Sequence, residues 1–160
     1  ATCTITAAAE GTDNNGGSVY TLDISKVNAS ISGGNQVLDG IVTVYASAAS
    51  KSIQNKTTYL QMTGSGVNIT SGSEYGLQLT LESKATITIT ATAKKSAGPW
   101  ALKNSKGTTD SSTNAVLLSD DPTKDPPTEI TFENVAAGTY MLGAKSNGGN
   151  LYSLTITYSE

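Results

Sequence analysis

Histidine and arginine are absent from this 160-residue sequence, so all ten of its basic residues are lysines. Without an imidazole that titrates near neutral pH, the chain can form neither a Ser-His-Asp or Cys-His relay nor an ordinary histidine zinc site. Without a guanidinium group it has no bidentate clamp for phosphate or carboxylate. These absences remove the most familiar catalytic arrangements, and we expect the chain not to be an enzyme.

Cysteine, charge and long apolar runs are also scarce. Cys3 is the only cysteine, so no internal disulfide can form, and we expect it to be a small, half-buried strand residue. Phosphate binding needs a basic surface, and the net charge of −3 therefore predicts no nucleic-acid partner. No apolar run approaches the ~18 residues that span a bilayer, so we expect no membrane partner.

What the sequence does contain is Thr, Ser, Ala and Gly, with 16 glycines, 4 prolines and 14% charged residues. β-Branched residues favour strands, and Gly and Asn favour the tight turns between them. The length suits one domain covering residues 1–160, expected to be monomeric. The polar composition, the few cysteines and the start at Ala1 are typical of a mature extracellular segment, which predicts a secreted protein.

Alternation with a period of two residues is the clearest structural signal. Residues 85–93 place Ile and Ala on one face and Thr on the other, which indicates a half-buried strand. Leucines alternate with polar residues in the same way over residues 77–81. The short connection at residues 82–84 predicts that these two strands form a hairpin.

Further strands are predicted from the same pattern, whereas no twelve-residue window shows a helical stripe. About ten to twelve short strands with Gly, Asn and Ser turns predict an all-β fold, an antiparallel, jelly-roll-like β-sandwich. The clearer further strands are residues 41–45, 58–62, 129–132, 140–144 and 152–158; the weaker ones are residues 4–7, 19–24, 67–70, 100–103 and 115–118. The residues expected to face the core are Leu77, Leu79, Leu81, Ile87, Ile89, Ile130, Phe132, Leu142, Leu154 and Ile156.

The order of motifs from residue 57 to the end resembles a known family. T-T-Y-L-Q-M at residues 57–62 precedes the alternating pair at 77–93, and A-L-K-N-S-K-G follows at 101–107. V-A-A-G-T-Y-M-L at 135–142 and N-L-Y-S-L-T-I at 150–156 close the series. This arrangement is similar to the small carbohydrate-binding modules appended to bacterial pectate lyases, including the pectin-binding kind, and it covers about two thirds of the chain.

The resemblance implies a non-catalytic module that targets a plant cell-wall polysaccharide, with pectin or homogalacturonan favoured, attached to a catalytic domain in the parent protein. Gln61 departs from the pattern, because the pectin-binding modules tend to have Lys there, and this chain has a longer N-terminal part. The alternative is a structural or adhesin-type β-sandwich that makes interactions on a bacterial surface or scaffold protein. An exposed aromatic ring beside converging polar groups would distinguish the two, since a spacer needs none.

Aromatic rings are candidates for binding because they stack on the apolar faces of sugar rings. Trp100 is the only Trp, and we expect either that its ring is exposed and binds the glycan or that it lies in the core. Tyr59 and Gln61 are further candidate ligand-binding residues. Among the other tyrosines, Tyr45, Tyr140 and Tyr158 are in phase with apolar neighbours and are expected in the core, whereas Tyr75 and Tyr152 are candidates for a surface.

Charged residues give two more candidate sites. Five of the ten lysines fall within residues 84–106, and Lys94, Lys95 and Lys103 could together offer ammonium groups to uronic acid carboxylates. The competing interpretation is a solvated face that protects a sheet edge. The sequence also offers a candidate site for a structural Ca²⁺, since carboxylates are suitable hard ligands. Its candidate ligands are Asp120, Asp121 and Asp125.

Overall fold

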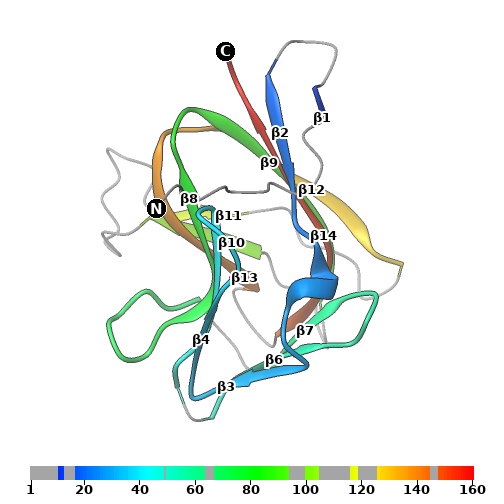
Figure 1. Ribbon diagram of the computed structural model, residues 1–160, viewed down its shortest axis with the longest axis vertical. Coiled ribbons are helices and arrows are strands. Elements are labelled where there is room, and N and C mark those ends of the chain that lie inside the picture. Colours follow the sequence, from blue (N-terminus) through cyan, green and yellow to red (C-terminus); the bar gives the residue numbers. More distant parts are fainter. Residues whose placement is uncertain are drawn as a thin grey trace, which may run out of the picture.

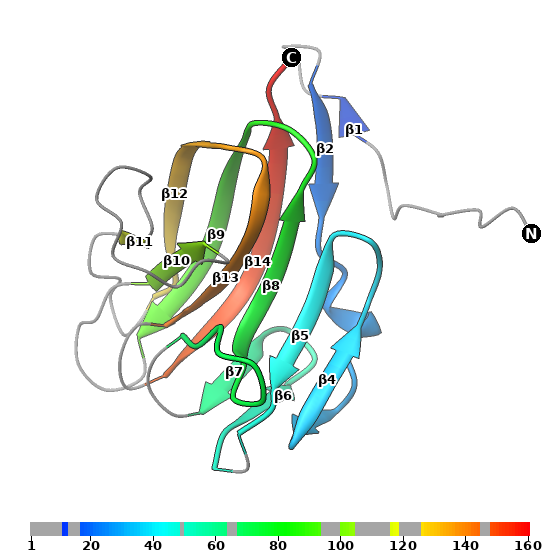
Figure 2. The same ribbon diagram turned by 90° about the vertical axis from the view of Figure 1, so that its left-hand side faces the viewer.

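The computed structural model describes residues 11–12, 17–48, 50–63, 67–93, 100–104, 116–118, 126–144 and 148–160. These residues form fourteen β-strands and one short 3₁₀ helix, η1 (Ile24–Lys26), whose start is capped by the Asp23 carboxylate. The strands lie in two layers that face each other, as Figures 1 and 2 show, and every pairing between named strands is antiparallel. The prediction of an all-β antiparallel sandwich is confirmed.

The first layer is an eight-stranded sheet in which the C-terminal strand is central. β14 pairs with β9 along one side, and on its other side it pairs with β2 and β7 at successive positions. β12 extends the sheet beyond β9, and β6 and β3 extend it beyond β7. The strands are β1 (Gly11–Thr12), β2 (Ser18–Thr21), β3 (Ser30–Ser32), β6 (Ser52–Asn55), β7 (Leu60–Thr63), β9 (Ala85–Ala93), β12 (Thr128–Val135) and β14 (Gly149–Tyr158).

The second layer is a six-stranded sheet in the order β11-β10-β13-β8-β5-β4. Its central pair, β8 and β13, runs in register from Gly138 opposite Leu81 to Leu142 opposite Leu77. The strands are β4 (Gly34–Val37), β5 (Val42–Ala46), β8 (Tyr75–Leu81), β10 (Trp100–Asn104), β11 (Val116–Leu118) and β13 (Gly138–Ala144).

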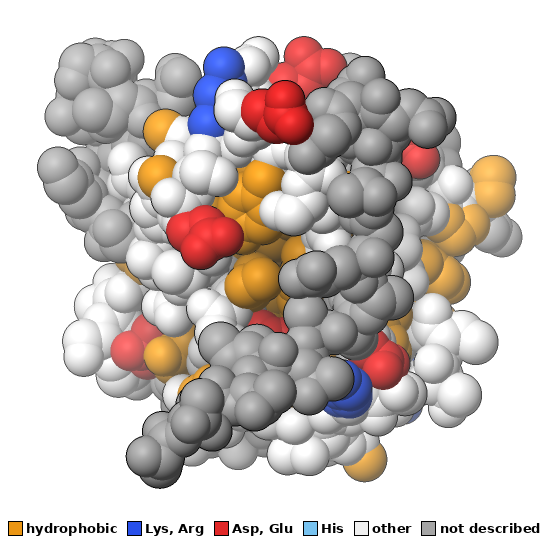
Figure 3. Space-filling model, turned by 45° about the horizontal axis from the view of Figure 1, so that its top comes forward, with side chains coloured by type: hydrophobic (Ala, Val, Ile, Leu, Met, Phe, Trp, Pro, Cys, Tyr) orange, Lys and Arg blue, Asp and Glu red, His pale blue; other side chains and the backbone are white. Residues whose placement is uncertain are grey.

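The core lies between the sheets and follows the alternation of the sequence. All ten residues that were expected to face inward are buried, from Leu77 on β8 to Ile156 on β14. The opposite phase of the same strands carries mostly polar side chains, such as Gln78 on β8, Thr88 on β9 and Glu129 on β12. A space-filling view of one side of the molecule shows a small area of hydrophobic side chains flanked by acidic ones (Figure 3), in keeping with the net charge of −3.

The predicted hairpin between residues 77–81 and 85–93 does not form. β8 pairs with β5 and β13 in the six-stranded sheet, whereas β9 pairs with β12 and β14 in the other sheet. Residues 82–84 therefore carry the chain from one sheet to the other. Both strands bury an apolar face, and placing them in opposite layers lets those faces pack against each other across the core.

Several boundaries also differ from the predictions. Residues 22–24 leave the strand that starts at Ser18, because Asp23 caps the 3₁₀ turn. Residues 67–70 form only an isolated bridge between Asn68 and Tyr75. Alternation does not predict β3, β4 and β6, because these strands are three or four residues long and largely polar. Predicted residues 4–7 lie outside the described part of the chain.

Candidate functional site

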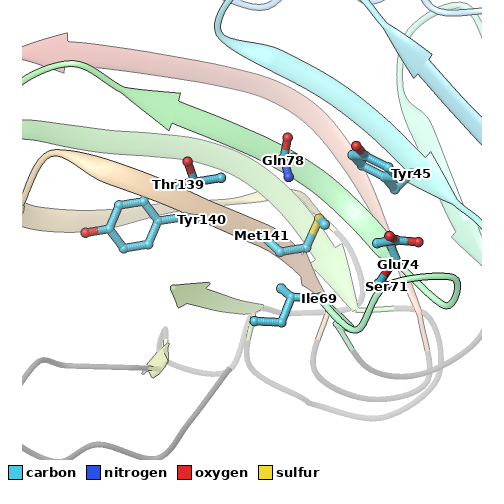
Figure 4. Close-up of a pocket in the computed structure, with 8 residues that line it drawn as sticks. All are labelled: Tyr45, Ile69, Ser71, Glu74, Gln78, Thr139, Tyr140 and Met141. Carbon is cyan, nitrogen blue, oxygen red and sulfur yellow. The ribbon is translucent and has the colours of Figure 1, made fainter. Parts of the chain in front are cut away.

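A pocket of ≈ 220 Å³ opens on the outer face of the six-stranded sheet. Figure 4 shows Thr139 and Tyr140 at one end of it, Gln78 and Met141 in the middle, and Tyr45 near Glu74 at the other end. Ile69 and Ser71 complete the lining. The pocket thus combines aromatic rings with an amide, a carboxylate and hydroxyl groups.

The floor of the pocket is set by strand register. Gln78 lies between Leu77 and Leu79, which face the core, so its carboxamide is on the outer face. It stands opposite Met141 of the neighbouring strand β13, and the Met141 side chain is 1% exposed. Tyr45 on β5 is half-buried and packs against the small outer cluster that includes Met141. The floor is therefore apolar at Met141 and polar at Gln78, with an aromatic ring beside both.

One wall of the pocket is formed by residues 67–74, before β8, and hydrogen bonds hold it on the sheet. The Lys103 ammonium donates to the Val67 carbonyl at 2.9 Å. Asn68 and Tyr75 exchange two backbone hydrogen bonds, of 3.1 Å and 2.8 Å. The Asn68 side chain also accepts from the Thr70 amide at 2.9 Å. These contacts fix the wall before any ligand arrives, so little ordering entropy is lost on binding.

Tyr75 anchors the end of this wall to the other sheet. Its hydroxyl donates to the carbonyls of Thr63 at 2.6 Å and Ser52 at 3.2 Å, and the Lys51 ammonium lies 4.8 Å from its ring centroid. Burial raises the pKa of the Tyr75 hydroxyl, so it stays protonated and keeps donating throughout the physiological range. The expectation that Tyr75 lines a surface is wrong, since its side chain is 1% exposed.

Glu74 gives the pocket a negative charge. Hydrogen bonds from its own backbone amide and from the Ser47 side chain stabilise the charged form and lower the pKa of the Glu74 carboxyl. The carboxylate therefore accepts hydrogen bonds and donates none at neutral pH. Within the described residues, the Gln78 carboxamide and the Tyr45 hydroxyl make no hydrogen bond, which leaves both able to bond a ligand.

The outer face of the eight-stranded sheet holds a second group of interest. The rings of Tyr59 and Tyr152 lie 5.1 Å apart, centroid to centroid, with 36° between their planes. Both are half-buried. Tyr59 directly precedes β7, and Gln61 follows it on the same face, opposite Asn150 of β14. The structure therefore brings together two of the predicted binding residues, Tyr59 and Gln61, but on the opposite sheet from the pocket.

Trp100 is not at either surface. Its side chain is 0% exposed and belongs to the core between the sheets, opposite Ala144 in the register of β10 and β13. The prediction that its ring is exposed for stacking is wrong, and the competing core interpretation holds. Trp100 is in phase with Leu102, which is also buried, so the strand directs both side chains inward.

The structure describes only one residue of the predicted cationic and metal sites, Lys103. Lys103 lies on the outer face of the six-stranded sheet, where its ammonium bonds the Val67 carbonyl. The other predicted site residues, which are Lys94, Lys95, Asp120, Asp121 and Asp125, lie outside the described residues, as does Cys3. Among the residues that are described, no group of three His, Cys, Asp or Glu side chains could hold a metal ion.

Sequence reasoning missed most of the pocket. Tyr45 was expected in the core, but it stands one residue from Val44, which is 0% exposed, and faces outward. Tyr158 is buried as expected, and Tyr140 packs partly against the core. Gln78 carried a usable signal, because it is the polar residue within a run of buried leucines.

Comparison with known proteins gives no family model and no curated protein that matches the chain. Among solved structures, the carbohydrate-binding module CBM6cm-2 of Cellvibrio mixtus lichenase 5A, in complex with cellotriose, is similar at 13% identity and a TM-score of 0.41. That likeness covers 88% of this chain and 97% of that one. Within the described residues, no helix is long and apolar enough to cross a membrane.

A second similar structure is the CBM22-1 and GH10 fragment of Clostridium thermocellum endo-1,4-beta-D-xylanase 10B, complexed with xylohexaose, at 14% identity and a TM-score of 0.34. The likeness covers 89% of this chain but only 26% of the solved xylanase chain. Both TM-scores are below 0.5, so neither likeness indicates what this chain binds.

Proposed function

We propose that this chain is a non-catalytic carbohydrate-binding module that holds a neutral plant cell-wall polysaccharide in the pocket of the six-stranded sheet. The observation that supports this most directly is the pocket itself, which sets the Tyr45 ring beside the Gln78 carboxamide and the Glu74 carboxylate. Concave sites of this kind, apolar with a few convergent polar groups, are where small ligands bind.

Each part of a sugar has a matching group in the pocket. The apolar face of a pyranose ring packs on Tyr45 and Met141, as sugars do on aromatic and apolar surfaces. Its hydroxyl groups donate to the Glu74 carboxylate and exchange hydrogen bonds with Gln78 and Thr139. A hydrogen bond to a charged acceptor is shorter and stronger than one to a neutral acceptor, so Glu74 is expected to orient the sugar.

The charge of the pocket favours a neutral sugar over a uronic acid. Glu74 is ionised at neutral pH and repels a carboxylate. Lys103 uses its ammonium to hold the Val67 carbonyl in place. A preference for pectin would therefore have to come from Lys94 and Lys95. The pectin preference stays a prediction from the sequence. We further propose, from the composition and the family resemblance, that the module works outside the cell beside a catalytic domain.

The alternative, a spacer or adhesin-type sandwich, has no use for this combination of groups. A spacer needs a folded core and a solvated surface, and neither requires an aromatic ring beside an unpaired amide. The pocket therefore favours a binding module over a spacer. The aromatic ring that supports this choice is Tyr45, not Trp100.

Affinity electrophoresis against soluble cellulose derivatives, xylan, mannan, xyloglucan and de-esterified pectin tests the proposal. We expect retardation by at least one neutral polysaccharide that is insensitive to salt. Tyr45→Ala and Gln78→Ala should each weaken retention by about 1–2 kcal/mol, or about 5- to 30-fold in Kd. Thr80→Ala is the matched control, because Thr80 is exposed on the same strand as Gln78 but outside the pocket.

Two results would contradict the proposal. The first is migration that no polysaccharide changes, which indicates a spacer. The second is retention that Tyr45→Ala and Gln78→Ala leave intact, which places binding elsewhere. Retention by de-esterified pectin alone, lost as salt is raised, would retain the module but replace its neutral ligand with an acidic one.

A further inference from the structure

We propose that the outer face of the eight-stranded sheet is a second glycan-binding surface, so that one module joins two neutral polysaccharide chains. This inference rests on the proposed function, because both surfaces would take the same class of ligand. We call it the tyrosine face and define it by Tyr59, Tyr152, Gln61, Asn150 and Gln54.

The two tyrosines form a joined aromatic platform. Leu60 and Leu151 are opposite each other in the β7–β14 register and are 0% exposed, so their neighbours Tyr59 and Tyr152 are directed to the outer face. Their ring centroids are 5.1 Å apart, which is within the range of a stabilising aromatic pair. Each ring restrains the other, so the platform is ordered before a sugar stacks on it.

A row of hydrogen-bonding side chains runs beside the platform, across three strands. Register places Gln54 of β6 opposite Gln61 of β7, and Gln61 opposite Asn150 of β14. Strands are spaced about 4.8 Å apart, so the row spans about 10 Å. It ends at Thr92 of β9, which stands opposite Asn150 and is 3% exposed. Amides both donate and accept hydrogen bonds, as the hydroxyl groups of sugars do. The described residues supply no hydrogen-bond partner to the Gln54 or Gln61 side chain.

Asn150 adds an independent observation. Its Oδ1 atom is buried and, among the described residues, has no hydrogen-bond donor. An unsatisfied buried acceptor is costly, and few natural structures keep one without a reason. The atom has less than 1 Å² of exposed surface, so a sugar bound on Tyr59 and Tyr152 would supply the missing donor once the Asn150 side chain rotates toward the tyrosine face.

The charges around the tyrosine face favour a neutral ligand. Lys56 is exposed in the turn before Tyr59, and Glu129 is exposed on β12, beyond β9. An exposed cation such as Lys56 attracts a uronic acid weakly, because such pairs are screened by water and salt. The amides and rings carry no charge, so recognition depends on stacking and hydroxyl bonding.

The two sites cannot bind the same stretch of one chain. The pocket and the tyrosine face lie on the outer faces of opposite sheets, and packed sheets are about 10 Å apart before the outer side chains are counted. A single module would therefore hold two separate chains, or two distant parts of one chain. Two linked binding events raise retention on a dense polysaccharide well above that on a short oligosaccharide.

Isothermal titration calorimetry with the hexasaccharides of cellulose, xylan and mannan tests the second site. We expect two binding events per module with at least one hexasaccharide. Tyr152→Ala or Gln61→Ala should leave one event, Tyr45→Ala should leave the other, and the Tyr45→Ala, Gln61→Ala double variant should leave none. Thr131→Ala on β12 is the control, because Thr131 is exposed on the same face but two strands from Tyr152.

The single-event outcomes separate this inference from the proposed function. One event that only Tyr45→Ala removes would overturn the tyrosine face and keep the pocket. One event that only Tyr152→Ala and Gln61→Ala remove would keep the tyrosine face and overturn the pocket. Gln61→Ala changes a half-buried polar side chain, so its result stands even where Tyr152→Ala disturbs the fold. No binding of any hexasaccharide would overturn both.

Discussion

Replacing Trp100 by alanine tests whether this residue stabilises the core or binds the ligand. The ring is 0% exposed, and its Cζ2 atom lies 3.1 Å from the point where a Cβ on Gly149 would sit, so it fills its space closely. Truncating a buried Trp to Ala costs about 3–5 kcal/mol. A typical domain is stable by about 5–15 kcal/mol, so the variant should fold but unfold at a lower urea concentration.

The size of the effect can be measured directly. With an m-value of about 2 kcal/mol/M, a loss of about 4 kcal/mol lowers the urea midpoint by about 2 M. Circular dichroism is the appropriate probe, because the substitution removes the only Trp of the chain. Trp100→Phe keeps most of the buried ring and should lose less. In folded wild-type protein, glycan binding should leave Trp fluorescence unchanged, since the ring is 0% exposed.

Either of two results would refute this reasoning. The first is a Trp100→Ala variant with the wild-type urea midpoint and no glycan retention, which would make the ring a ligand contact. The second is strong quenching of wild-type Trp fluorescence by a saturating hexasaccharide. Retention by the folded fraction of the variant, at wild-type affinity, is the result that the buried position requires.

Three further predictions follow from contacts described above. Gly149→Ala should destabilise the fold by about 1–3 kcal/mol in a urea titration, because its Cβ would lie 2.4 Å from the Thr92 carbonyl oxygen, whereas Gly40→Ala, with nothing within 4 Å, should not. Lys103→Met keeps the side-chain stem but frees the pocket wall, so affinity for a neutral glycan should fall with no change in salt dependence; a steeper salt dependence would contradict this. The pKa of Glu74 is lowered, so its charged carboxylate is available to a ligand above the usual glutamate range and is lost only as pH falls through the folded-state pKa. Glycan retention should therefore be constant from about pH 8 to pH 5. A loss of retention with its midpoint near pH 6 would contradict this prediction.

The sequence determined the core well because alternation reports burial directly. Ile87 and Ile89 are separated by a single Thr, and a one-residue change of phase would expose both, so their direction could be predicted without knowing their partners. Pairing is a different matter. Alternation does not say which strand lies beside which, and the three-residue link between β8 and β9 suits a hairpin as well as a crossing between sheets.

The pocket was harder to predict because it joins residues from three parts of the chain. Tyr45, Gln78 and Met141 become neighbours only through the β5–β8 and β8–β13 registers. Tyr59 and Gln61 were predicted together because they belong to one motif, yet the residues that the structure places beside them, Tyr152 and Asn150, lie about 90 residues further on. Trp100 was ambiguous because one aromatic residue at the start of a strand fits either face.

The central position of β14 has a consequence for how the protein is made. Synthesis proceeds from the N-terminus, so β2, β7 and β9 leave the ribosome well before the strand that all three pair with. Until β14 emerges, each of them has an unpaired edge, and such edges are prone to pair with other chains. We expect the eight-stranded sheet to assemble only after the ten residues of β14, Gly149–Tyr158, have been synthesised. Folding should also be slow, since the strand pairings join distant parts of the chain.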